Sequence, residues 1–362
     1  MKHAGRVVEI DALRGLAIVG MLVVNVATAE VRQAVPQVEH VAWHGLHAAD
    51  VVFPAFLFVA GCAMALSGGS TSFVRIARRV VILFGLGLLL NAIDSVDPDT
   101  FRVMGVLQRI ALSYGLAAVM MRRGGPVGWA VGATALAGLH WVALVARVDG
   151  FSSLTPGGNG VAAAVDRVVL GPAHSYLGLL PDPEGLLSTL GGTATILSGA
   201  LAMTLWRHRR GTVLLALASV ISVAAGYGWS QLLPLNKILW TGSYVLVTAG
   251  ISGLLLVGLV LVNRVGGSSR KRGSSSGRSG VLGPVAALGR NALAVYVITE
   301  ALRRLARRPL ASGTSPLQSL ITATTDLTGS ALTAGWLVVV LAILLASAVA
   351  SVLAWRNLTL RA

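Results

Sequence analysis

The chain has 362 residues, of which 55% are hydrophobic and 12% are charged, with a mean hydropathy of +0.77. Soluble domains carry about 25% charged residues, so a soluble core could not bury this composition. The formal net charge of +15 would fit nucleic-acid binding in a soluble protein. Here most Lys and Arg fall in short segments between apolar runs, a pattern that reports membrane orientation and argues against nucleic acid as a partner. With Cys62 alone, a disulfide framework is excluded.

Apolar segments of roughly 17 to 25 residues are long enough to cross a bilayer. About ten such segments occur, at 12–29, 48–67, 76–93, 104–121, 127–146, 186–206, 212–228, 239–262, 282–300 and 333–355. They predict an all-α polytopic membrane helical bundle of about 10 transmembrane helices, forming a single domain over residues 1–362. Both termini then lie on one side. Basic runs near 75–79, 122–123, 207–210 and 264–278 share that side, so the positive-inside rule predicts cytoplasmic termini.

Two segments between predicted spans stand out. Residues 147–185 are long and rich in Gly, Pro and Asp, which favours an ordered external cap over a site. Residues 266–280, GGSSRKRGSSSGRSG, have the low-complexity composition of a flexible cytoplasmic linker.

The stretch 40–61, HVAWHGLHAADVVFPAFLFVAG, places polar chemistry at the mouth of a predicted span. His40, His44 and His47 recur at helical spacing, as a zinc site would require, but Gly45 interrupts the helix and we predict no metal. A single imidazole, with a pKa near 6.5, suits a general base at neutral pH. Asp50 could cap the second span or belong to the site.

Further polar residues lie inside or beside the other predicted spans. If the sides alternate, nearly all of them approach the outer half of the membrane, where they would form a polar pocket. Arg109 could instead pair with Asp50 or Glu300 and neutralise a buried charge, and the asparagines could bridge helices. The candidates for substrate or cofactor binding are Trp43, Asp50, Gln108, Arg109, Asn236, Lys237, Asn291 and Glu300.

Six blocks, in order along the chain, resemble the transmembrane catalytic domain of the heparan-alpha-glucosaminide N-acetyltransferase family. They are EIDALRGLAIVGMLVVN (9–25), the 40–61 stretch, FRVMGVLQRIALSY (101–114), DPEGLLSTL (182–190), LLPLNKILWTGSYVLVTAG (232–250) and GRNALAVYV (289–297). The blocks extend from the first predicted span to the ninth, and apolar composition alone would not reproduce them.

The resemblance implies a transferase that moves acetyl from cytoplasmic acetyl-CoA to the amino group of a terminal glucosamine on the far side of the membrane. The family's catalytic histidine, in an H-x-x-W-x-G-L motif, matches His40, as a base or as a transient acetyl carrier. A family asparagine of the site matches Asn25. The resemblance also suggests a homodimer. We expect the polyanionic coenzyme to be drawn to the basic loops at 75–79 or 122–123.

Two departures from the family affect the predicted substrate. The segment between Asn25 and His40 is longer than in the animal enzyme, and no counterpart of that enzyme's large luminal domain is present. We therefore expect the acceptor to be an amino sugar of an envelope polymer, or of its breakdown products, at the cytoplasmic membrane of a bacterium. Three alternatives stay open: a transporter or flippase using the same polar cavity, an O-acetyltransferase, and a structural membrane subunit.

Overall fold

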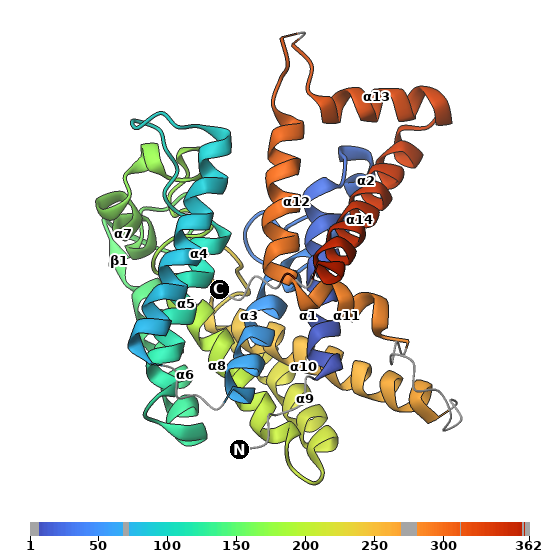
Figure 1. Ribbon diagram of the computed structural model, residues 1–362. Helices are drawn as coiled ribbons and strands as arrows, with labels where there is room; N and C mark the ends of the chain where they lie inside the picture. The colour runs from blue at the N-terminus through green and yellow to red at the C-terminus, as the bar shows by residue number, and fades with distance from the viewer. Residues whose placement is uncertain (1–6, 68–71, 269–280, 312, 357, 359–362) are drawn as a thin grey trace.

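A computed structural model describes residues 7–67, 72–268, 281–311, 313–356 and 358 (Figure 1). The fold is all-α, as predicted, and 74% of it is helical. In the described part of the chain, the strands β1 (Arg147–Val148) and β2 (Phe151–Ser152) pair into one antiparallel ribbon. The α-helices are α1 (Val8–Val26), α2 (Ala29–Ala34), α3 (Ala48–Leu66), α4 (Phe73–Asp94), α5 (Val106–Met121), α6 (Gly125–Val145), α7 (Val161–Val169), α8 (Thr189–Trp206), α9 (Gly211–Trp229), α10 (Gly242–Ser268), α11 (Gly283–Arg290), α12 (Ala292–Arg307), α13 (Pro316–Thr328) and α14 (Ala331–Trp355). Short 3-10 turns are η1 (Pro36–Val38), η2 (Pro172–His174) and η3 (Tyr176–Gly178).

Every predicted apolar segment lies in a helix, but the ninth is broken into α11 and α12, which are bent by 78°. By length and apolar composition alone, six described helices could cross a membrane, or seven if the bent pair counts as one span. The predicted count of about ten is therefore not confirmed. The helix α5 has only 16 residues, and the first two turns of α1 carry Glu9, Asp11 and Arg14.

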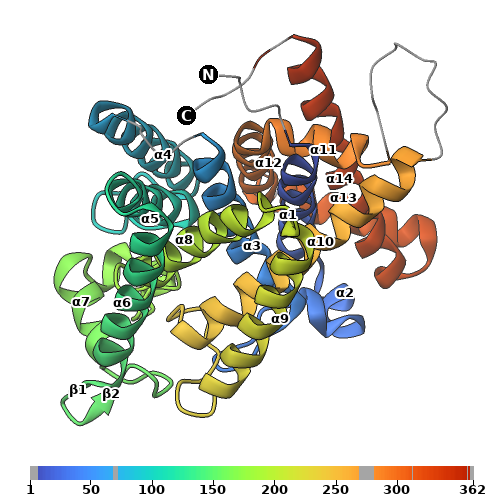
Figure 2. The same cartoon turned by 90° about the horizontal axis from the view of Figure 1, so that it is seen from below.

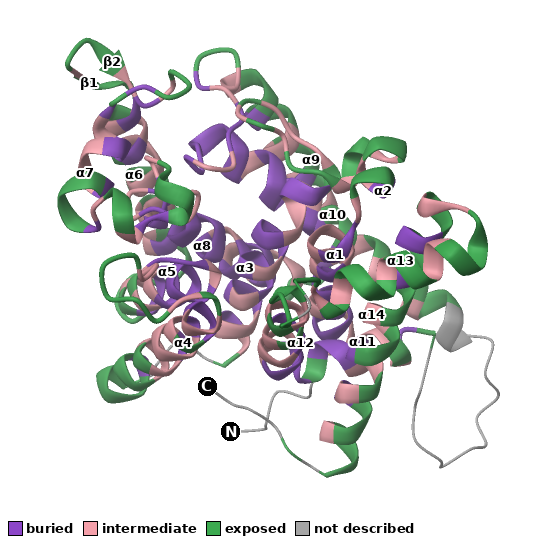
Figure 3. Cartoon of the chain, turned by 90° about the horizontal axis from the view of Figure 1, so that it is seen from above, coloured by how far each residue is buried: buried purple, intermediate pink, exposed green. Residues whose placement is uncertain are grey.

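The core is centred on α3 and α8, which cross with their backbones in contact. A Cβ atom added to Gly61 would lie 1.8 Å from the carbonyl oxygen of Ile196, and one added to Gly199 would lie 1.9 Å from that of Phe58. Small residues allow such close approach between helices in membranes. Figure 3 shows α3, α8 and α5 largely in the buried colour, whereas α4 and α14 are mostly exposed or intermediate. Seen from below, α8 and α3 lie between α5 and α1 (Figure 2).

The segment 147–185 has secondary structure of its own: the β ribbon, α7, η2 and η3. Asp166 on α7 accepts hydrogen bonds from the backbone N–H groups of Asp182 and Leu186, both at 3.0 Å. Arg102, just before α5, donates to Asp182 and Glu184 at 3.1 and 2.5 Å. These bonds fasten the segment to the bundle.

Two further findings concern the remaining connections. Residues 266–268 of the predicted linker lie in α10, while 269–280 lie outside the described residues. The sequence did not predict α2, α7 or α13. Figure 1 shows α13 crossing between the ends of α12 and α14.

Candidate active site

Three side chains from two distant segments meet beside the N-terminus of α3. His40 Nδ1 lies 2.8 Å from Asp50 Oδ1, and Lys237 Nζ lies 2.8 Å from His40 Nε2. Lys237 Nζ is also 3.9 Å from Asp50 Oδ1. The Asp50 side chain is buried, with 1% exposed, whereas that of His40 is 43% exposed. The imidazole is thus exposed at the surface of the protein, while its carboxylate partner is buried.

Asp50 is held in this geometry because it is also the third residue of α3, in a capping box whose N-cap residue is His47. At the third helical position, its Oδ2 accepts from the backbone N–H groups of His47 at 3.0 Å and Val41 at 3.3 Å. The hydroxyl of Tyr244 donates to the Asp50 backbone carbonyl. The two oxygens of Asp50 therefore have different partners: Oδ2 accepts from the backbone at the start of α3, and Oδ1 contacts His40. Tyr244 was missed, since a tyrosine in an apolar helix gives no distinctive signal.

The charge on Lys237 determines how the hydrogen bonds to His40 are directed. Burial lowers the pKa of Lys237 from 10.5 to about 8, although the charges of Asp50 and Glu184 act in the opposite direction. An ammonium only donates and a carboxylate only accepts. While Lys237 is protonated, it therefore donates to Nε2 of His40, and the Nδ1–H of His40 donates to Asp50. Both ring nitrogens of His40 then have a partner, and Nε2 is not free to accept from another group.

We refer to His40, Asp50 and Lys237 as the triad. Loop residues around it connect it to the 147–185 segment and to the turn before α10. The indole of Trp43 donates to the carbonyl of Leu154 at 2.9 Å, and His44 Nε2 lies 3.1 Å from the same oxygen. Asn236 Nδ2 lies 3.3 Å from His44 Nδ1. Desolvation lowers the pKa of His44, so it stays neutral at pH 7. Trp43 thus joins the loop before α3 to the 147–185 segment, and Asn236 joins it to the turn before α10. The described residues contain no group of three or more His, Cys, Asp or Glu able to hold a metal.

Two predicted site residues lie in the interior. Gln108 is buried and donates to the carbonyl of Val103 at 3.0 Å. Arg109 is fully buried, with its guanidinium 4.8 Å from the ring centre of Trp240. It donates to the Pro183 carbonyl and to Ser188 Oγ, the latter at 2.6 Å. Among the described residues no ion pair joins Arg109 to Asp50 or Glu300, so the expected pairing is not formed.

A large basic cavity opens at the other end of α3. Its volume is about 770 Å³, and α1, α3, α4, α5, α11 and α12 contribute to its walls. The arginines that line it are Arg14, Arg75, Arg78, Arg79 and Arg290. The walls also carry apolar side chains, which include Phe56, Ala60 and Ala63. Asn291 also lines this cavity, at the break between α11 and α12, and its Oδ1 is buried without a hydrogen-bond partner in the described structure.

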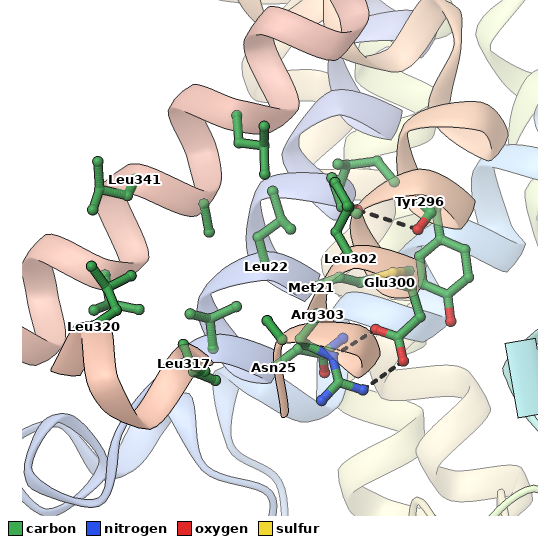
Figure 4. Close-up of a pocket in the computed structure, with 17 residues that line it drawn as sticks. Met21, Leu22, Asn25, Tyr296, Glu300, Leu302, Arg303, Leu317, Leu320 and Leu341 are labelled. Carbon is green, nitrogen blue, oxygen red and sulfur yellow. Dashed lines mark hydrogen bonds and ion pairs between the residues drawn. The ribbon is translucent and has the colours of Figure 1, made fainter. Parts of the chain in front are cut away.

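Asn25 and Glu300 line a different cavity, separate from the triad. Figure 4 shows them in a pocket with Tyr296 and Arg303. Glu300 accepts from Nε of Arg303 and from Nε of Arg304, both at 2.8 Å. In the described residues, no hydrogen bond joins Asn25 to His40. The predicted polar residues therefore form separate groups, not one pocket.

Comparison with known proteins agrees with the six sequence blocks. Residues 6–159 match the family described as heparan-alpha-glucosaminide N-acetyltransferase, catalytic. The heparan-alpha-glucosaminide N-acetyltransferase of Homo sapiens is 26% identical over 72% of this chain and 49% of its own length. That of Mus musculus is 27% identical over 67% of this chain and 47% of its own. The chain spans about half the length of these curated relatives. The chain is thus similar to the heparan-alpha-glucosaminide N-acetyltransferases, in agreement with the resemblance of its sequence blocks.

Proposed function

We propose that this protein is a multi-pass N-acetyltransferase that carries acetyl across a membrane. The donor is acetyl-CoA from the inner face, and the acceptor is the amino group of a glucosamine-type sugar on the outer face. In this proposal the broken and short helices also cross, giving about ten spans with both termini inside, in the cytoplasmic membrane of a bacterium. One observation carries it: an imidazole and a basic cavity lie at opposite ends of the same buried helix, α3.

The cavity has the chemistry that coenzyme A requires. Phosphates bind best to guanidinium groups, which offer several N–H donors in a planar fork, and Arg75, Arg78 and Arg79 stand together on its wall. On the walls of the same cavity, Phe56 and Ala60 offer an apolar lining for a thioester arm. Of the two basic loops expected from the sequence, the one at 75–79 lines the cavity, whereas Arg122 stacks over the ring of Phe73 at 4.0 Å.

In this proposal, the acetyl group moves only a short distance from the basic cavity to His40. Phe56 follows Asp50 by six residues on α3, which corresponds to ~9 Å of helix rise. A thioester placed at the level of Phe56 would therefore stand about two helical turns from the triad. Pro54 lies in this stretch of α3.

At the acceptor end, the reaction needs a base. An amine attacks a thioester only when its nitrogen carries a lone pair, so the sugar ammonium must first lose a proton. Nε2 of His40 takes that proton, and Asp50 stabilises the resulting imidazolium through Nδ1–H. The amine nitrogen then bonds to the acetyl carbon, the carbon–sulfur bond breaks, and the second proton that the nitrogen loses neutralises the departing thiolate. In the alternative mechanism, the acetyl group is first transferred to His40, and Nε2 is the atom that bonds to the acetyl carbon.

The test uses purified protein in liposomes, with radiolabelled acetyl-CoA and a panel of amino sugars on opposite sides. We expect label to reach an amino sugar, and His40→Ala to lower that rate by at least about 10²-fold. His208→Ala, in the exposed turn after α8, is the matched control and should keep the native rate.

The other outcomes are equally specific. Transfer to hydroxyl acceptors only would make the protein an O-acetyltransferase. Solute movement with no acetyl transfer would indicate a transporter. Native transfer by His40→Ala would remove His40 from the mechanism. A single turnover without acceptor separates the two mechanisms, because only an acetyl carrier leaves label on the protein.

A further inference from the structure

A second, smaller cavity lies on the far side of α1 from α3, bounded by α1, α12, α13 and α14. Its volume is about 200 Å³ (Figure 4). The walls are almost wholly apolar, with Ile18, Met21, Leu22, Leu317, Val338 and Leu345 among them. Leu302, Leu320 and Leu341, which also line it, are 42%, 39% and 46% exposed. The cavity is therefore open on one side, and its opening is framed by leucines.

Arginines gather at one end of this cavity. Arg303 lines it, and Arg307, one turn further along α12, donates to the backbone carbonyl of Asn25 at 3.2 Å. Arg307 also lies within electrostatic range of Arg32 on α2. The nearby acids are already engaged: Glu300 binds Arg303 and Arg304, and Asp94 binds Arg304.

Positive charge is consequently in excess here. Among the described residues, Glu300 and Asp94 balance Arg303 and Arg304, while neither Arg32 nor Arg307 forms an ion pair with an acidic side chain. Arg32 Nε is buried with no hydrogen-bond partner in the described structure. Like charges held together at an apolar boundary are costly, and an anion would relieve that cost.

We propose that this cavity binds an anionic phospholipid, with an acyl chain between α1, α12 and α14 and the phosphate against Arg307 and Arg32. The occupant is an amphiphile, because one end of the site is apolar and the other cationic. A soluble anion would use only the arginines, and an uncharged lipid only the leucines. The amphipathic α13, which crosses the ends of α12 and α14 in Figure 1, lays Leu317 and Leu320 over the acyl chain.

The site also accounts for an irregularity in the charge distribution. Arg303, Arg304, Arg307 and Arg308 form the densest basic run at the end of the bundle that the positive-inside rule assigns to the outside. Two of them are neutralised within the protein. An anionic headgroup would compensate the remainder in place, without a further acidic side chain.

The experiment measures lipid binding to the full chain, purified in a non-ionic detergent, by native mass spectrometry. The probes are dioleoylphosphatidylglycerol, dioleoylphosphatidylcholine and inorganic phosphate. We expect phosphatidylglycerol to bind about tenfold more tightly than phosphatidylcholine, and Arg307→Glu to weaken it about tenfold, as the loss of one charge-assisted hydrogen bond would. Arg147→Glu, an exposed arginine on β1, is the charge-matched control and should leave binding unchanged.

The apolar half of the site is tested by Ala342→Trp, which fills the cavity from α14 and should displace both lipids. For the cationic half, Arg307→Gln is used in place of Arg307→Glu if Arg307→Glu melts at a lower temperature than the native chain. Equal weakening by Arg147→Glu would indicate diffuse attraction and overturn the proposal. Displacement of phosphatidylglycerol by equimolar inorganic phosphate would overturn it too, as would native binding in Ala342→Trp. These readouts need no acetyl transfer, so they stand or fall independently of the proposed function.

Discussion

At the scale of single residues, the site depends on how Lys237 and Asp50 share one imidazole. His40 has a carboxylate on Nδ1 and an ammonium on Nε2, both at 2.8 Å. The carboxylate orients the ring and favours the form that carries its proton on Nδ1. In the proposed mechanism, the ammonium occupies the nitrogen of His40 that accepts the substrate's proton. We therefore propose that Lys237 controls the base and that this control depends on pH.

The first prediction concerns that dependence. Because the pKa of Lys237 is lowered to about 8, its ammonium blocks Nε2 below that pH and releases it above. We expect the transfer rate to rise about tenfold per pH unit up to pH ~8 and then level off. Lys237→Gln removes the ammonium, so the rise in rate that ends near pH 8 should disappear in this variant. Lys237→Arg keeps a cation at every pH and should stay slow throughout.

The measurement is a pH–rate profile from pH 5.5 to 9.5, with a weakly basic amine as acceptor so that the acceptor's own ionisation stays out of this window. Gln231→Glu, in the exposed turn before the same loop, serves as control. If the transfer rate of Lys237→Gln still rises up to pH ~8, a group other than Lys237 controls the pH dependence.

At the scale of elements, the contact between α3 and α8 decides whether the site exists. Gly199 packs against the backbone of Phe58 with no space for a Cβ atom. Gly199→Val should therefore separate the helices and lower the free energy of unfolding by about 3 kcal/mol. Gly138→Val, on α6, meets nothing within 4 Å and should cost far less. Thermal unfolding in detergent compares the two, and equal loss would show that the crossing is not close-packed.

The basic cavity supports a second prediction at this scale, because it is built by helix ends and not by one loop. Arg78→Gln removes one guanidinium from the wall and should raise the KM for acetyl-CoA about tenfold, with little change in kcat. Arg209→Gln, in the turn between α8 and α9, lies outside the cavity and should change neither. Steady-state kinetics with varied acetyl-CoA decide this. A fall in kcat at constant KM would place Arg78 in the chemical step instead.

At the scale of the whole molecule, the proposal requires the two ends of α3 to face opposite sides of a membrane. Because Cys62 is the single cysteine, a Cys62→Ala chain accepts one new thiol at a time. Val168→Cys, 85% exposed on α7, should react with an impermeant maleimide on intact cells. Arg209→Cys should react only after the cells are opened. Labelling of both from outside would disprove the proposed sidedness.

The residues recognised from sequence divide clearly by how the structure uses them. His40 and Asp50 are ten residues apart, and helix capping at α3 brings them together locally. Lys237 was recognised as polar, but its partner was not, because 197 residues separate it from His40. Asn25 and Glu300 were expected in the same pocket as His40. They face another cavity because the rotation of α1 and α12 about their axes is fixed by packing, which periodicity alone does not specify.

The sequence by itself determined the all-α class, the position of the long apolar helices and the similarity to the acetyltransferases. Those features follow from hydrophobic runs and from local motifs, which depend on neighbouring residues in the chain. Only the tertiary structure decided that ninth-span residues split between two cavities, that Arg109 binds Pro183 and Ser188, and that Lys237 occupies His40. Each of these depends on which helix faces meet, and that is set by close packing of glycines and side chains across the bundle.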